Sequence, residues 1–131
     1  MFASYANRAS AYAKVGVETG VTSASPHKLI LMLYDGALAS IRASVVSMEH
    51  HDIAAKGQHI SKAINIIVNG LKASLDLNAG GEIASRLDAL YDYMTDRFLY
   101  ANLHNNTAAL EEVFDLLGGL REAWQGITDQ Q

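Results

Sequence analysis

The chain has 131 residues, of which half are hydrophobic and 18% are charged, and its formal net charge is −4. This balance favours a folded domain with a real core over a disordered chain. The absence of cysteine excludes disulfides and thiolate metal sites. No basic run occurs, which argues against nucleic-acid binding. The N-terminus lacks the basic start and long apolar stretch of a secretory signal, so we expect a cytoplasmic protein without membrane insertion.

The patterning is helical throughout. β-type alternation is scarce and the chain contains one proline, so we predict an all-α protein. Short connections between long helices indicate an antiparallel up-down-up-down four-helix bundle with a short N-terminal helix or arm. We expect one domain over residues 1–131, with the arm at 1–24, the bundle at 25–127 and a polar tail at 128–131.

The first long helix is predicted over 26–48. Ser25 is a good N-cap, and proline at position 26 suits the first helical position. At 3.6 residues per turn, one stripe faces the core: Ile30, Leu33, Tyr34, Ala37, Ile41, Val45 and Met48. The run Leu29–Tyr34 is apolar all round and too short to span a membrane, which needs about 20 apolar residues. A second apolar face therefore needs a partner, and we place Met32, Ala39 and Val46 on it.

Three further helices are predicted over 53–75, 82–103 and 108–126. Their core stripes are Ile53, Ile60, Ala63, Ile64, Ile67, Leu71 and Leu75 in the second; Ile83, Leu87, Leu90, Tyr91, Met94, Phe98 and Ala101 in the third; and Leu110, Val113, Phe114, Leu117, Leu120 and Trp124 in the fourth. Outside these stripes lie further apolar or small residues: Ile66, Gly70, Ala73, Leu77, Leu99 and Leu103. With the three residues of the first helix, they are our candidate binding surface, because grooves between helices suit an amphipathic or extended segment.

The sequence offers little chemistry. No core stripe carries the inward carboxylates and Glu-x-x-His pairs of a di-iron bundle, and His50-His51-Asp52 is better explained as a solvated turn than as a metal site. We predict no cofactor. Two alternatives stay open. His59 and Lys62 resemble the His-x-x-Lys-Gly signature of histidine phosphotransfer domains, although Ala63 replaces the glycine. The second faces also suit a bundle that merely dimerises.

A resemblance to a known family covers nearly the whole chain in order. The chain resembles the flagellin export chaperone family, FliS, through Ser-Ala-Ser-Pro-His-Lys-Leu-Ile at 23–30 and Met-Leu-Tyr-Asp-Gly-Ala at 32–37. Further matching stretches lie at 11–15, 62–67, 70–72, 80–84, 90–94 and 122–124. Each is weak alone, but their joint order and spacing are specific.

The resemblance implies a non-enzymatic cytoplasmic bundle that binds the C-terminal segment of newly made flagellin. Binding blocks premature polymerisation and hands flagellin to the export gate of the flagellar type III apparatus, without nucleotide or metal. Tyr12 matches a family position associated with the N-terminal region and gate docking, and Tyr5 lies seven residues earlier on the same predicted face. We expect a monomer or weak homodimer.

Overall fold

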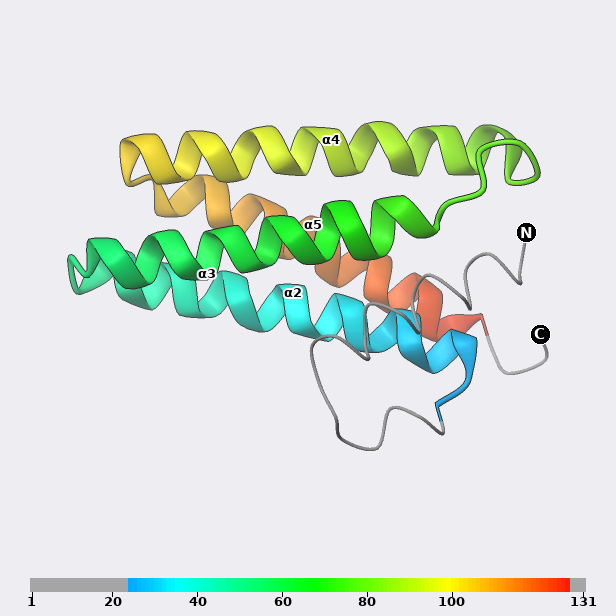
Figure 1. The fold of residues 1–131 in the computed structure, drawn as a ribbon, viewed down its shortest axis with the longest axis horizontal. Coiled ribbons are helices and arrows are strands. Elements are labelled where there is room, and N and C mark those ends of the chain that lie inside the picture. Colours follow the sequence, from blue (N-terminus) through cyan, green and yellow to red (C-terminus); the bar gives the residue numbers. More distant parts are fainter. Residues whose placement is uncertain (1–23, 128–131) are drawn as a thin grey trace.

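The computed structural model describes residues 24–127, which form a bundle of four long helices (Figure 1). Helix α2 spans Pro26–Glu49, α3 spans Ile53–Asn65, α4 spans Gly81–His104 and α5 spans Thr107–Gly126. A π turn, η2 (Ile66–Leu71), and a 3₁₀ turn, η3 (Lys72–Ser74), extend α3. The all-α bundle is therefore confirmed, and successive helices run in opposite directions (Figure 1). The predicted arm, apart from Ala24, and the polar tail lie outside the described residues.

Polar caps explain why the helices begin where they do. The side chain of Ser25 accepts a hydrogen bond from the backbone of Lys28 at 3.1 Å, and Asp52 and Asn106 cap α3 and α5 in the same way. Helix α4 begins at Gly81, whose φ of 61° suits glycine. The predicted bounds of α2, α4 and α5 are met within one residue.

Helix α2 is the central element, because it packs against both α3 and α5. Its predicted core stripe is confirmed, with Val45 at the margin. Within this core the Tyr34 and Tyr91 hydroxyls lie 2.8 Å apart and share a hydrogen bond. Leu29, the first residue of the apolar run Leu29–Tyr34, is also buried.

The start of α2 is tied to the end of α5. The His27 ring stacks on Trp124 with 5.2 Å between centroids. His27 Nε2 donates to the Trp124 carbonyl at 2.8 Å, and the indole N–H donates to the His27 carbonyl at 2.9 Å. Asp35 and Arg121 form an ion pair between the same two helices. The start of α2 and the end of α5, which are far apart in the sequence, are therefore held together.

Two residues predicted for the second face lie in the core instead. Ile66 is only 4% exposed, and Gly70 is buried. A β-carbon at position 70 would lie 3.1 Å from Leu33 Cδ2, and one at Gly36 would lie 3.3 Å from Ile66 Cδ1. Each aliphatic side chain therefore packs over a glycine of the facing helix. The prediction was wrong because the α3 segment contacts both α2 and α4, so its buried arc is wider than one stripe.

Two predicted core residues are exposed. Ile53 is 75% and Ile83 is 73% accessible. Both stand in the first turn of a helix, Ile53 in α3 and Ile83 in α4. Helical periodicity assigns a direction to a side chain but does not say where the neighbouring helix ends. At these two positions no described residue covers the side chain.

Among the described helices, α2 alone is long and apolar enough to cross a membrane. Less than half of its most apolar window is buried, at 44%. The central helix of a bundle meets the same criteria of length and composition, and the contacts of α2 with α3 and α5 account for its apolar character.

Candidate functional site

The remaining candidate residues lie on three separate elements. Six of the nine are exposed and one, Ala73, is half-buried. The exposed six are Met32, Ala39 and Val46 on α2, Leu77 after η3, and Leu99 and Leu103 on α4. They are spread over α2, the segment after η3, and α4, so no single pair of helices carries all six. Tyr5 and Tyr12 fall outside the described residues.

An apolar groove runs between α2 and α5, and it contains one candidate residue, Val46. The groove has a volume of about 310 Å³. Its walls are Ile41, Val45 and Val46 on α2 and Phe114 on α5, with charged Arg42 and Glu111 beside them. Val46 is 52% exposed, so its side chain is available to a partner. Such a groove accepts the apolar side chains of a helix or an extended segment.

Arg42 shapes one wall of this groove. Its guanidinium carbon lies 5.0 Å from the centre of the Phe114 ring, which is within cation–π range. The contact joins the two helices that form the groove and holds the ring in place. Sequence periodicity assigns Val45 and Phe114 to the core, and both are half-buried there. The groove itself has no sequence signal, because it depends on how far apart the two helices pack.

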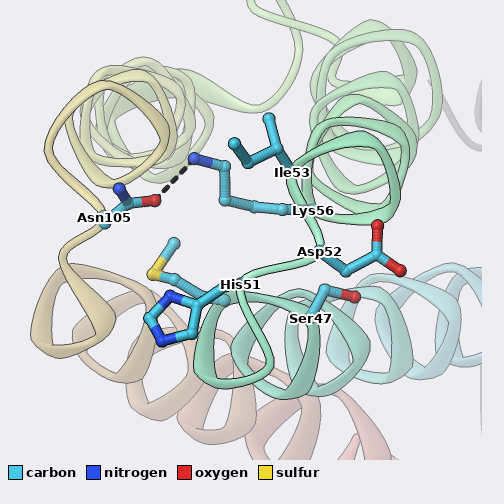
Figure 2. A pocket seen from close by; sticks show the side chains of 7 residues that line it. Ser47, His51, Asp52, Ile53, Lys56 and Asn105 are labelled. Carbon is cyan, nitrogen blue, oxygen red and sulfur yellow. Dashed lines mark hydrogen bonds between the residues drawn. The ribbon is translucent and has the colours of Figure 1, made fainter.

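A second hollow, which we call the Lys56 pocket, lies at the turn between α2 and α3 (Figure 2). It measures about 80 Å³ and is lined by Ser47, Met48, His51, Asp52, Ile53, Lys56 and Asn105. Lys56 is 7% exposed, although its sequence position gives no sign of burial. Its amine donates to Asn105 Oδ1 at 2.6 Å and to the Asn102 carbonyl at 3.0 Å. Sequence reasoning missed this residue.

Charged pairs fasten α4 to its neighbours. Arg97 Nε lies 2.9 Å from Glu112 Oε1, and the Tyr93 hydroxyl donates to the other oxygen at 2.5 Å. These hydrogen bonds, the one from Tyr93 first, lower the pKa of Glu112, while the same bond raises the pKa of Tyr93. Lys72 bridges Asp88 and Asp92 of α4, and the hydrogen bond that its amine donates to Asp88 raises the pKa of Lys72. These groups are placed to hold helices together.

The histidines lie in different environments. His50 Nδ1 bonds the carbonyl of Val46 at 2.9 Å, and His51 lines the Lys56 pocket. Residues 24–127 hold no group of three or more His, Asp or Glu side chains arranged to hold a metal ion. His59 is half-buried and Lys62 is exposed on α3. Among the described residues, no other acidic or basic side chain forms a hydrogen bond with His59 or Lys62.

These features define a four-helix bundle with hollows between helices that ion pairs hold together. The comparisons with known proteins give the particular family. The model of the family described as "Flagellar protein FliS" matches residues 8–131. The chain belongs to the FliS family.

Curated relatives agree with this placement. The flagellar secretion chaperone FliS of Salmonella typhimurium is 55% identical over 118 residues, which cover 90% of this chain and 87% of the relative. That of Escherichia coli is 45% identical, over 88% of this chain and 85% of the relative. The flagellar secretion chaperone FliSB of Pseudomonas aeruginosa is 43% identical, over 89% and 92%. The chain is thus a chaperone in flagellar secretion and not an enzyme, and the phosphotransfer alternative has no support.

Proposed function

We propose that this protein binds the C-terminal segment of flagellin in the cytoplasm, prevents its premature polymerisation and delivers it to the flagellar type III export apparatus. The relatives' names support a secretion chaperone. The single observation that carries the binding step is the apolar groove between α2 and α5, with Val46 exposed on its wall.

The mechanism follows from competition for apolar surface. A segment that packs against copies of itself in a filament is adhesive when free. A bundle with apolar grooves offers it a competing partner. Ordering a flexible segment on binding costs about 2–5 kcal/mol or more, so burial over one small groove is insufficient. We therefore assign Met32, Ala39, Ala73, Leu77, Leu99 and Leu103 to further contacts of a segment that wraps around several helices.

Delivery requires a second contact, which we assign to the N-terminal region with Tyr5 and Tyr12. The chaperone acts in this scheme as a monomer or weak homodimer. A divided interface suits release, because separate contacts can be removed one after another at the gate. Replacing Tyr12 by alanine is expected to weaken gate binding while flagellin binding stays unchanged.

The deciding experiment is co-purification of flagellin with and without its C-terminal segment. Binding that survives removal of this segment would refute the assignment. The groove is tested with Val46→Asp, which sets a charge in an apolar site, and we expect at least about tenfold weaker binding, equivalent to about 1.4 kcal/mol. Ile83→Asp is the matched control, because Ile83 is exposed in α4 and outside every proposed contact. Equal affinities for the two variants would exclude the α2–α5 groove.

A further inference from the structure

Lys56 is a buried cation whose amine is bonded, among the described residues, to neutral oxygens only. Its stem crosses from α3 to the end of α4, and its amine points at Asn105 and away from Asp52 (Figure 2). Within residues 24–127 this amine forms no ion pair. The carboxylate of Asp52 is used elsewhere, since its Oδ1 accepts from the backbone of Ala55 at 3.1 Å.

This arrangement compensates the charge only in part. Asn102 and Asn105 lie at the C-terminus of α4, where the helix dipole favours a cation. An ammonium has three N–H donors, and two of them are occupied here. A charge removed from water is most stable when it is also paired with an opposite charge. One N–H donor therefore remains for an incoming anion, and no opposite charge among the described residues is paired with the ammonium.

The space beside the amine suits a small acidic group. The Lys56 pocket has about 80 Å³, which is room for a few water-sized groups. Ser47, 8% exposed, lines it with a hydroxyl that bonds to no other described residue. Ile53, which lines the same pocket, is 75% exposed and gives it an apolar edge. The ammonium of Lys56 and the hydroxyl of Ser47, beside the apolar side chain of Ile53, match an acidic side chain that has an apolar neighbour.

We propose that the Lys56 pocket receives a carboxylate side chain of the exported protein, whose neighbouring apolar side chain lies on Ile53. The carboxylate accepts the third hydrogen bond of the Lys56 ammonium. This inference rests on the proposed function, because the occupant is taken from the bound flagellin segment. It adds a polar anchor that fixes the register of a segment which apolar grooves alone would hold loosely.

Two experiments test the pocket. In the first, the free protein is titrated with sodium acetate and, separately, with sodium chloride at equal ionic strength, and NMR shifts are recorded for the Ile53 methyls, the Lys56 side chain and the Asn105 amide. Acetate-specific shifts at these three groups are expected. In the second, flagellin affinity is measured for Lys56→Met and Ile53→Ser, with Ile83→Ser as the matched control. Ile83 is in the first turn of α4, and α4 begins at the opposite end of the bundle from the start of α3 (Figure 1).

We expect Lys56→Met to bind flagellin at least about tenfold more weakly, because truncating one partner of a buried charge pair is costly. Ile53→Ser weakens binding by a smaller factor and Ile83→Ser leaves it unchanged. Since Lys56→Met also removes the link to α4, Ile53→Ser serves as the variant with an intact link. Acetate shifts equal to those of chloride, with Ile53→Ser at wild-type affinity, would overturn the proposal. Flagellin that fails to bind the wild type refutes the proposed function instead, and the acetate titration still decides whether the pocket binds a carboxylate.

Discussion

Replacing Ile66 by valine deletes the Cδ1 atom that lies 3.3 Å from where a β-carbon of Gly36 would stand. Ile66 is 4% exposed, so the substitution leaves a methyl-sized gap in the core. Such changes lower the free energy of unfolding by about 0.5–1.5 kcal/mol. Gly36→Ala alone has two opposed effects. It gains about 1 kcal/mol of helix propensity and loses part or all of this gain, because the new methyl crowds Ile66.

The double variant separates these effects. With Ile66→Val, the space left by Cδ1 is free for the methyl of Gly36→Ala. The two substitutions are therefore expected to be more favourable together than the sum of their separate effects, with a coupling of at least about 0.5 kcal/mol. The sign of this coupling holds whether Gly36→Ala alone stabilises or destabilises. The wild type, the two single variants and the double variant are unfolded in urea, and unfolding is monitored by circular dichroism. The slope of the free energy of unfolding against urea concentration must be the same for all four proteins.

A coupling of zero or of opposite sign would refute the packing of Ile66 over Gly36. So would an Ile66→Val protein with the stability of the wild type, since an exposed isoleucine tolerates that change. Val46→Ala is the control, because Val46 is 52% exposed and surface substitutions stay within about 0.5 kcal/mol.

Two other predictions concern the α4–α5 half. Gly119→Ala in α5 is expected to raise the free energy of unfolding by about 0.5–1 kcal/mol in urea melts, because a β-carbon there meets nothing within 4 Å; a loss of stability would contradict this. The hydrogen bond from Tyr93 is the first cause of the lowered pKa of Glu112, so Tyr93→Phe should raise that pKa, as measured by NMR titration of the Glu112 side chain. A lowered carboxyl pKa contributes stability that is present above the ordinary value of 4.5 and is lost as the pH falls through the folded-state value. This acid-dependent loss of stability should be smaller in Tyr93→Phe. An unchanged pKa of Glu112 would contradict the role of the Tyr93 hydrogen bond.

Much of the bundle is predictable because local rules decide it. Ser25, Asp52 and Asn106 each cap a helix through a side-chain oxygen, and such caps are visible as residue types in the sequence. The core stripe of α2 follows from periodicity in the same way. Both signals act over one or two helical turns and need no knowledge of the neighbours.

The errors occur where a second helix decides the outcome. Ile66 and Gly70 are buried because α2 approaches the α3 segment closely, and a glycine on each side permits this approach. Ile53 is exposed because no helix covers the first turn of α3 at that side. Lys56 is buried because the end of α4 supplies two oxygens for its amine. None of these facts is encoded within one helix.

The candidate surface was predictable only as a set of apolar residues outside the core stripes. The structure confirms the exposure of six of the nine, including Met32 and Val46 on α2. The groove beside Val46 also needs Phe114 of α5, which periodicity assigns to the core. Their roles in binding stay predictions.

The mutual hold of His27 and Trp124 has a consequence for synthesis of the chain. These residues are separated by 97 positions, and chain growth proceeds from the N-terminus at roughly 5–20 residues per second. Until α5 has left the ribosome, α2 lacks one of the two helices that cover it, and its most apolar surface stands open. For the seconds needed to make the rest of the chain, the nascent chaperone thus itself exposes adhesive surface, and only the last helix closes it.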